Sequence, residues 1–254
     1  MSFNIRYGLA DDGPNSWSHR RHLVFGVLES HRPVIVGLQE ALDFQIDEIL
    51  AEMPAYASIG IGREADGGGE YAAILYSKKS FELLERDTFW LSDTPETPSA
   101  SWGNKLFRIC TWARFRHRAS DQELYVYNTH FDHRSEESRE QSAHLIAERI
   151  AGRKHSNAPF ILMGDFNAGE DTIPIEVLLN REGKARMLDT YRALYPNESS
   201  AGTFGAWEGR TEGDKIDYVF ADSRMDVLDA AIVRDNAEGR YPSDHYPVTA
   251  RVGF

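Results

Sequence analysis

PFILMGDFN, residues 159–167, is the stretch from which the fold of this chain can be inferred. Residues 159–163 carry no polar side chain, which is typical of a short strand buried on both faces. Gly164 ends this run, and Asp165 and Asn167 follow directly, so both are expected where a core strand emerges from its sheet. An Asp/Asn/Gly sequence on its own is more often an ordinary turn. The same arrangement recurs elsewhere in the chain, and this recurrence favours a functional site.

The length and composition are those of one acidic domain. A single domain over residues 1–254 is predicted, because the chain can bury a sizeable core and no shift of composition marks a boundary. No apolar run reaches about 18 residues, so no membrane span is expected. The formal net charge of −12 argues against a broad non-specific grip on nucleic acid, which depends on many Lys/Arg contacts to phosphate. Clustered acids are, however, what hard metal ions need.

The N-terminus and the cysteine content leave the compartment open. A strand-like sequence begins at Ser2, which predicts a trimmed start and leaves a removed export signal possible. The single cysteine, Cys110, excludes an internal disulfide. We expect a monomer in the cytoplasm, with secretion as the alternative.

Apolar runs and their spacing predict strands and helices along the whole chain. Helices are expected before Pro33, over 42–50 and over 135–151. Residues 92–104 form a Pro/Ser/Thr-rich loop, interpreted as an insertion. Strands are expected over residues 2–7, 34–36, 81–91, 106–117, 124–130, 216–220, 226–233 and from 246 onward, with two hairpin strands flanking residues 67–69.

One order of elements occurs twice. Strand, helix, apolar strand and acid follow one another over residues 2–40 and again over 124–165. Two similar half-domains that face each other would explain this repeat. Each half would deliver polar groups to the same sheet edge.

Six polar clusters stand at the ends of the predicted apolar strands. Any one of them is more often a turn or a cap than a ligand. Six in one chain indicate a site, because ionisable groups are costly to desolvate unless they are paired or bound to a metal. The clusters are Asn4, Gln39–Glu40, Asn128–His130–Asp132, Asp165–Asn167, Asp217 and Asp244–His245.

The segments that carry these residues resemble the endonuclease/exonuclease/phosphatase superfamily, which has the fold of deoxyribonuclease I. They are, in the family order, FNIRYG (3–8), GLQEA (37–41), NTHFDH (128–133), GDFNA (164–168), KIDYVF (215–220) and SDHYPV (243–248). The resemblance implies an α+β fold, a four-layer α/β/β/α sandwich of two packed mixed β-sheets flanked by helices. It also implies a divalent-metal-dependent hydrolase that cleaves phosphate esters by in-line attack of an activated water.

The resemblance further implies a role for each polar cluster. Glu40 would be the principal ligand of Mg²⁺ or Mn²⁺, with Asn4 and Asp244 beside it, since oxygen donors suit both ions. Asp165 and Asn167 would position the attacking water and bind the metal or the phosphate.

Two histidine–carboxylate pairs are implied as well. Asp217 would orient His245, which would act as general base or hold the phosphate. Glu70 would orient His130 on the leaving-group side. Such pairs suit in-line displacement, where one side loses a proton and the other gains one. Which histidine is the acid and which the base stays open.

Departures from the family pattern bear on the substrate. Arg6 stands where the DNA-repair branch usually has an acid, which puts a second metal in doubt. Ala41–Leu42 replace the arginine that deoxyribonuclease I-like enzymes insert into the minor groove. Small phosphate esters or single-stranded nucleic acid are therefore favoured as substrates, and a duplex-DNA endonuclease is the alternative. The candidates for substrate contact are Asn128, Arg108 and Trp102. Arg108 is equally well explained as a solvated charge on a strand, and Trp102 as a side chain that anchors its loop.

A catalytically inactive binding module on the same fold is the other alternative. Such a module would lack one or more of Glu40, Asp165, Asn167 and His245, and all four are present.

Overall fold

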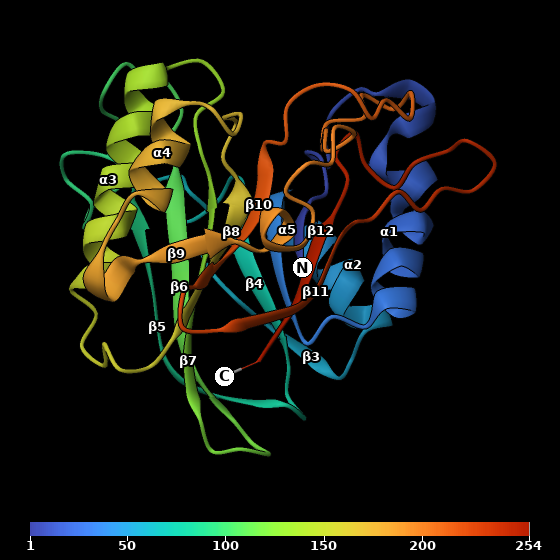
Figure 1. Ribbon diagram of the computed structural model, residues 1–254. Coiled ribbons are helices and arrows are strands. Elements are labelled where there is room, and N and C mark those ends of the chain that lie inside the picture. The colour runs from blue at the N-terminus through green and yellow to red at the C-terminus, as the bar shows by residue number, and fades with distance from the viewer. Residues whose placement is uncertain (254) are drawn as a thin grey trace.

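The computed structural model describes residues 1–253 and consists of two six-stranded sheets packed face to face, with helices outside. Figure 1 shows α1 (Trp17–His31) and α2 (Asp43–Glu52) on one side, and α3 (Glu136–Ala151) and α4 (Ile173–Leu179) on the other. This arrangement confirms the predicted four-layer α/β/β/α sandwich.

Both sheets are mixed, with one parallel pair of strands in each. The first sheet has the spatial order β11 (Asp226–Ile232), β12 (Val248–Gly253), β1 (Ser2–Asn4), β2 (Ile35–Ala41), β4 (Tyr71–Ser77) and β3 (Tyr56–Ile59). The second has the order β5 (Phe81–Trp90), β6 (Ile109–His117), β7 (Glu123–His130), β8 (Phe160–Asp165), β10 (Asp217–Asp222) and β9 (Met187–Asp189). The remaining elements are α5 (Thr190–Leu194) and two 3₁₀ turns, Gly13–Asn15 and Gly183–Ala185.

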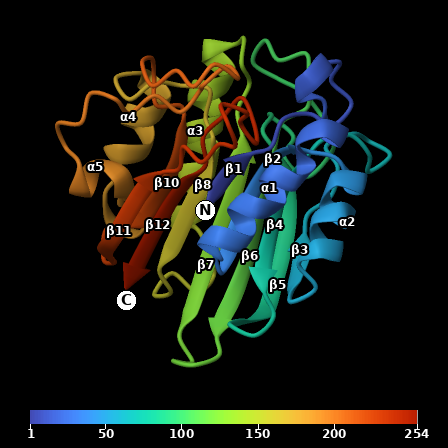
Figure 2. The ribbon, with the colours of Figure 1, turned by 90° about the vertical axis from the view of Figure 1, so that its right-hand side faces the viewer.

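The predicted core strand is β8, which lies between β7 and β10 (Figure 2). Phe160 and Leu162 belong to the apolar layer under α3 and α4, whereas Ile161 and Met163 belong to the layer between the sheets. The strand is therefore apolar on both faces because it serves two layers. Burial of each such side chain contributes about 1.5–3 kcal/mol.

Gly164 is required by the close approach of two strands. A Cβ atom at this position would lie 2.2 Å from the carbonyl oxygen of Thr129 on β7. Glycine thus lets β8 pair with β7 up to its last residue, and places Asp165 opposite His130 in the register.

The repeated order of elements corresponds to one parallel β–α–β unit in each sheet. In the first unit β1 and β2 pair in parallel, and Asn4 lies opposite Gln39. In the second, β7 and β8 pair in parallel, and His130 lies opposite Asp165. Parallel strands end at the same edge of a sheet, so each unit carries its polar residues to one edge.

Some elements differ from the sequence-based expectation. β1 ends at Asn4, because the backbone turns at Arg6 with a φ of 62°. Residues 170–200, for which the sequence predicts no helix or strand, contain α4, β9 and α5. These elements are too short, at three to seven residues, for their periodicity to be recognised. Within residues 1–253, no helix has the length and apolar character needed to cross a membrane.

Candidate active site

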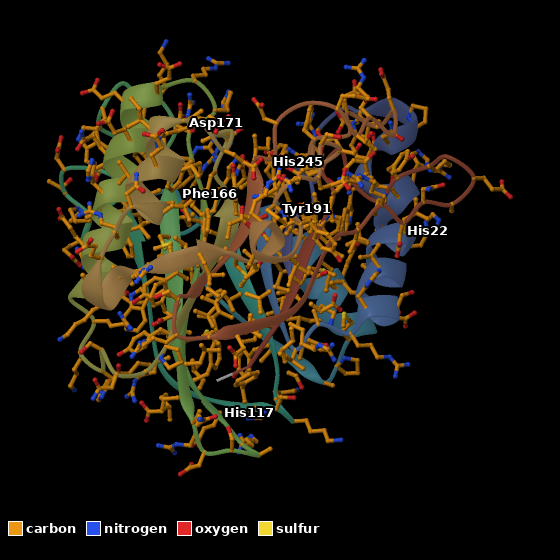
Figure 3. The ribbon with its side chains drawn as sticks, viewed as in Figure 1. His22, His117, Phe166, Asp171, Tyr191 and His245 are labelled. Atoms are coloured by element: carbon orange, nitrogen blue, oxygen red, sulfur yellow. The ribbon has the colours of Figure 1, made fainter. Side chains whose placement is uncertain are left out.

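The polar clusters predicted from sequence gather at one end of the sandwich. The first sheet contributes Asn4 and Glu40, and the segment before β12 contributes Asp244 and His245. The second sheet contributes residues at the ends of β7 and β8 and at the start of β10. In Figure 3, His245 lies toward this end and His117, at the far end of β6, lies at the opposite one.

Asp165 is the residue to which the others are connected. Its Oδ2 accepts a hydrogen bond from Asn4 Nδ2 (2.9 Å). The same oxygen lies 3.5 Å from His130 Nε2 and 3.8 Å from His245 Nε2. Its Oδ1 accepts a hydrogen bond from the backbone N–H of Asn167 (2.9 Å). One buried carboxylate thus faces two imidazoles from different sheets.

The predicted pairing of Asp217 with His245 is present. Asp217 Oδ2 lies 2.9 Å from His245 Nδ1. Asp217 Oδ1 is buried and has no hydrogen-bond partner within residues 1–253. Asp165, Asp217 and His245 each offer a ligand atom within 4.8 Å of the other two.

Glu40 occupies a strained position at the end of β2. Its φ is 58°, in the left-handed region that non-glycine residues adopt at some cost. Its carboxylate accepts hydrogen bonds from Asn4 Nδ2 (3.1 Å) and from the backbone N–H of Tyr7 (2.8 Å). These contacts direct the carboxylate toward Asn4 and the centre of the site.

Arg6 lies between two of the proposed metal ligands. Asp12 holds its guanidinium through two hydrogen bonds of 2.9 Å. The same group lies 4.0 Å from Glu40 Oε2 and 3.8 Å from Asp244 Oδ2. A fixed positive charge therefore stands beside these carboxylates, at the position where the family resemblance puts a second metal ion in doubt.

The two histidines have opposite electrostatic surroundings. Burial opposes the charged form of His245, but the carboxylates of Asp217, Asp165 and Asp244 raise its pKa well above the ordinary value. Burial lowers the pKa of His130, and the positive charges of Arg108 and other neighbours lower it further. These opposite shifts favour the imidazolium form of His245 and the neutral form of His130.

The carboxylates of the site fit a divalent cation. Burial and the charge of Asp217 raise the pKa of Asp165, and burial together with Glu40 raises that of Asp244. The raised pKa values mean that these buried carboxylates have too little positive charge near them to offset their burial and mutual repulsion. The donors are oxygen atoms, which Mg²⁺ and Mn²⁺ prefer. Asp217 Oδ1, which is buried and has no hydrogen-bond partner within residues 1–253, would also be stabilised by a nearby cation.

Glu70 differs from its predicted role as the partner of His130. Its Oε2 lies 4.0 Å from His130 Nδ1, which is beyond hydrogen-bond distance. It instead accepts a hydrogen bond of 2.8 Å from Arg63 Nη1. Arg63 stands in a loop before β4 with no recognisable motif around it, so the sequence held no signal for this contact.

Asn128 does not line the site, which corrects its predicted role in substrate contact. Its side chain is fully buried between the sheets. Its Nδ2 donates to the carbonyl oxygens of Leu38 (2.9 Å) and Ala73 (2.8 Å), and its Oδ1 accepts from Gln39 Nε2 (2.6 Å). The residue therefore joins β7 to β2 and β4.

The other predicted residues have mixed surroundings. Asn167, with a φ of 48°, donates from Nδ2 to the carbonyl of Phe131 (3.0 Å). Trp102 donates from Nε1 to Asp93 (2.9 Å), a contact typical of a loop anchor. Arg108 is buried, and its Nη2 lies 3.1 Å from His133 Nδ1. Phe204, which is 45% exposed, packs edge-on against His245 with ring centroids 5.0 Å apart.

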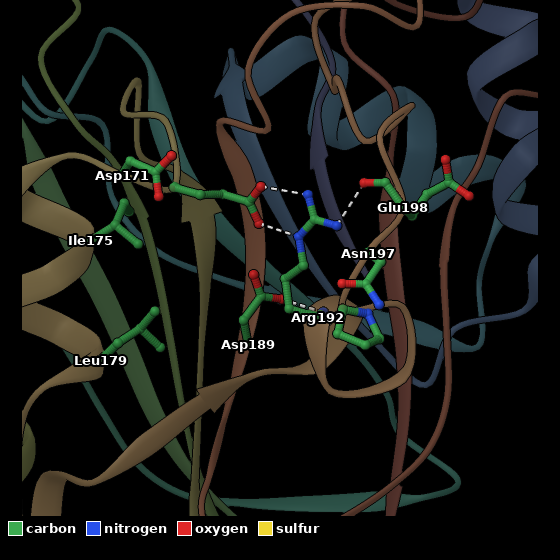
Figure 4. A pocket seen from close by; sticks show the side chains of 9 residues that line it. Asp171, Ile175, Leu179, Asp189, Arg192, Asn197 and Glu198 are labelled. Carbon is green, nitrogen blue, oxygen red and sulfur yellow. Dashed lines mark hydrogen bonds and ion pairs between the residues drawn. The ribbon is translucent and has the colours of Figure 1, made fainter.

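A separate hollow of about 480 Å³ lies between α4 and α5 (Figure 4). Arg192 crosses it, donating to both carboxylate oxygens of Glu170 (2.6 Å each) and to the carbonyl of Glu198 (2.7 Å). Lys215 lies buried nearby, 2.6 Å from Asp189. The positive charges of Arg192 and Lys215 are compensated by Glu170 and Asp189, so we assign these side chains to the stability of the fold.

Comparisons with known proteins agree with this geometry. The model of the Endonuclease/Exonuclease/phosphatase family matches residues 1–245. The structure of mannosyl-6-phosphatase from Bacteroides thetaiotaomicron is similar, with 29% identity, a TM-score of 0.90, and coverage of 100% of this chain and 98% of that one. An endonuclease/exonuclease/phosphatase from Bacteroides vulgatus is 33% identical, with a TM-score of 0.89 and coverage of 99% and 97%. An uncharacterized protein of Acanthamoeba polyphaga mimivirus is 28% identical over 215 residues, which are 80% of this chain and 79% of that protein.

The family match covers nearly the whole chain, and the residues of all six sequence segments meet in or beside one site. The chain belongs to the endonuclease/exonuclease/phosphatase family and is a phosphoric ester hydrolase.

Proposed function

We propose that the protein is a divalent-metal-dependent phosphoesterase that acts on small phosphate esters. The observation that carries this proposal is the approach of His130 Nε2 and His245 Nε2 to the same oxygen of Asp165, at 3.5 and 3.8 Å. A phosphate beside Asp165 would have a neutral imidazole on one side and an imidazolium on the other. This asymmetry suits a displacement in which one proton is removed and another is supplied.

Each side chain has a role that follows from its protonation. Asp165, whose pKa is raised by burial and by Asp217, is a stronger base than an ordinary aspartate and can take a proton from the attacking water at Oδ2. His245, kept charged chiefly by Asp217, can donate its Nε2 proton to the leaving oxygen of the ester, which departs as the alcohol. His130, which is neutral, lies close enough to Asp165 Oδ2 to exchange the proton with it.

Glu40, Asn4 and Asp244 are the residues that would hold Mg²⁺ or Mn²⁺, with Asp165 and Asn167 beside them. When bound, the ion would supply positive charge to the phosphate oxygens. Arg6, fixed by Asp12 near Glu40 and Asp244, supports one ion rather than two, because its guanidinium already neutralises part of their charge.

A small substrate is supported by three observations. The net charge is −12, which disfavours a long polyanion. Ala41 and Leu42, where a groove-binding arginine would stand, are both buried. A structure with a TM-score of 0.90 to this chain and full coverage of it is that of a mannosyl-6-phosphatase.

An activity screen tests the proposal. The purified chain is assayed with Mg²⁺, with Mn²⁺ and with EDTA on hexose monophosphates, bis-p-nitrophenyl phosphate, single-stranded RNA and duplex DNA. We expect metal-dependent hydrolysis of a small ester and little cleavage of duplex DNA. Activity that persists in EDTA, or that is greatest on duplex DNA, contradicts the proposal.

A further inference from the structure

A small cavity lies beside the imidazole of His130, on the side of the ring that faces Glu70. Its volume is about 10 Å³, and its lining includes Arg63, Glu70, Arg108 and His130. One water-sized group needs about 10–15 Å³ of such space. The cavity therefore has room for a single hydroxyl group and no room for a phosphoryl group.

Two buried arginines of this lining each have an unused hydrogen-bond donor. Arg63 is 8% exposed and Arg108 is 3% exposed, and the Nε of each has no hydrogen-bond partner within residues 1–253. Carboxylate oxygens of Glu64 and Asp132 lie 3.5 and 3.7 Å from these two nitrogens and form no hydrogen bond with them. An unpaired buried donor costs free energy, so each Nε gains from an acceptor in the cavity.

Glu70 adds an acceptor whose position is fixed. Its Oε2 accepts from Arg63 Nη1 at 2.8 Å, and its backbone carbonyl accepts from the backbone N–H of Arg63 at 3.0 Å. Trp90 Nε1 in turn donates to the carbonyl of Arg63 at 2.8 Å. Arg63 and Glu70 are therefore held opposite each other in advance, which lowers the cost of ordering them around a bound group.

The mixed polarity of the lining favours a neutral hydroxyl group. The carboxylate of Glu70 would repel an anion, and the two guanidinium groups would repel a cation. A hydroxyl oxygen has two lone pairs and one O–H. It can accept from Nε of Arg63 and Nε of Arg108, and donate to Glu70. Ala72, Phe107 and Ile109 complete the lining, and they offer apolar contact to the carbon that carries the hydroxyl.

The cavity is next to the place where the phosphate would react. His130 Nε2 lies 3.5 Å from Asp165 Oδ2, whereas Nδ1 of the same ring lies 4.0 Å from Glu70 Oε2. The side chains of His130 and Glu70 keep 11% and 17% of their surface exposed, so they leave a way in from solvent. A substrate that extends from Asp165 past the imidazole ring reaches the cavity within a few bonds of its phosphate.

We propose that this cavity binds one hydroxyl group of the substrate's alcohol, on one of the two carbons beyond the ester carbon. Arg63, Glu70 and Arg108 are then the residues that select for it. The proposal rests on the proposed function and narrows its small phosphate esters to those of polyols, such as glycerol and sugars. A firmly held water molecule offers the same atoms as a hydroxyl group, and the experiment separates the two.

The test compares three esters that differ only in one hydroxyl group: propyl phosphate, 2-hydroxypropyl phosphate and 3-hydroxypropyl phosphate. The value of kcat/KM is measured for each at saturating Mg²⁺. Arg63→Lys keeps a positive charge for Glu70 and removes the Nε donor. Arg108→Lys removes the other Nε, and tests the same subsite if Arg63→Lys does not fold. Arg86→Lys, at an exposed position on β5, is the matched control.

We expect the wild-type protein to prefer one of the hydroxylated esters over propyl phosphate by at least about tenfold, the effect of one charge-assisted hydrogen bond. In Arg63→Lys and in Arg108→Lys this preference should fall below about threefold, whereas Arg86→Lys should keep it. A purely structural role of the arginines would lower kcat/KM for all three esters by the same factor. That result, or equal values for the three esters in the wild type, as expected if water fills the cavity, would overturn the subsite.

A binding measurement separates this proposal from the proposed function. If none of the three esters is hydrolysed, the proposed function falls, and the melting temperature with Mg²⁺ and each ester decides on the subsite. A larger gain from a hydroxylated ester than from propyl phosphate, in the wild type but not in Arg63→Lys, would keep the subsite, since a ligand stabilises the folded state by mass action. Equal gains would remove it. If hydrolysis depends on the metal but shows no preference among the esters, the subsite falls and the function stands.

Discussion

Asp217 Oδ2 lies 2.9 Å from His245 Nδ1, and both side chains are buried. Asp217 begins β10 of the second sheet, whereas His245 precedes β12 of the first. The pair therefore crosses from one sheet to the other, and its geometry depends on how the sheets pack. The contact fixes the ring so that Nε2 faces Asp165.

Asp217→Asn should reduce kcat/KM by at least about 100-fold, because the imidazolium loses the charge that orients and stabilises it. The gain in melting temperature with Mg²⁺ should change little. Asp226→Asn, an exposed position at the start of β11, is the control. Wild-type activity of Asp217→Asn at every pH would show that the pair has no catalytic role.

The pH dependence of kcat/KM should have an acid limb and an alkaline limb. Burial and the charge of Asp217 raise the pKa of Asp165 to about 7, so the proposed base gains a proton, and activity should fall, as the pH drops through this value. The pKa of His130 is lowered, so His130 gains its proton only at more acid pH. The pKa of His245 is raised well above 6.5, so His245 keeps its proton until alkaline pH, and activity should fall when the proton is lost. The profile is measured at saturating Mg²⁺, with His117→Asn as control. A kcat/KM that stays constant as the pH falls below about 7, or that has no alkaline limb, would contradict this assignment.

Much of the fold was predictable from local sequence, because the signals that carry it are local. The apolar run before Asp165 predicts a strand buried on both faces, and β8 is that strand. The repeated strand–helix–strand order predicts that polar residues meet at one edge, as Asn4 and Asp165 do. These inferences need only periodicity and the geometry of parallel strands.

Contacts between the sheets were not predictable in the same way. Asn128 lies on the same face of β7 as His130, two residues earlier, so its position suggests the site. It lies deeper between the sheets, however, where its amide binds the carbonyl oxygens of Leu38 and Ala73. Glu70 was assigned to His130, and Arg63 competes for it from a loop whose path no motif reveals. Such pairings depend on the packing of distant segments.

Glu40→Ala should abolish hydrolysis and remove most of the stabilisation by Mg²⁺. A ligand that binds only the folded state raises its stability by mass action, and this variant lacks the proposed principal carboxylate. The melting temperature is measured with Mg²⁺ and with EDTA, and Glu52→Ala, at the exposed end of α2, is the control. In EDTA the variant should be as stable as the wild type or slightly more so, since clustered acids repel one another. An equal gain with Mg²⁺ in both proteins would remove Glu40 from the metal site.

Glu70→Gln should have a milder effect than Asp217→Asn, with a loss in kcat/KM of less than about tenfold. His130 Nδ1 is 4.0 Å from Glu70, too far for the hydrogen bond by which a carboxylate orients an imidazole. Glutamine still offers an oxygen to Arg63, so the melting temperature should change little. A loss as large as that of Asp217→Asn would mean that Glu70 moves onto His130 during turnover.

Asn128→Ala separates a structural role from substrate contact. The amide donates to carbonyl oxygens on both β2 and β4, and its removal leaves Leu38 and Ala73 without these partners in the core. The free energy of unfolding should fall by about 1–3 kcal/mol, the cost of leaving a buried polar group unpaired. Gly37 also indicates a structural role for Asn128, because a Cβ atom at Gly37 would lie 2.5 Å from Asn128 Oδ1 and would displace the amide.

Urea unfolding of Asn128→Ala is compared with that of Asn157→Ala, an exposed asparagine before β8. We expect the midpoint of Asn128→Ala alone to fall, with the slope unchanged. At a temperature where the variant stays folded, KM should remain within about twofold of wild type, because a side chain held between the sheets does not reach the substrate. A sharp rise in KM with unchanged stability would instead restore Asn128 to the substrate site, since a purely structural residue cannot weaken binding without weakening the fold.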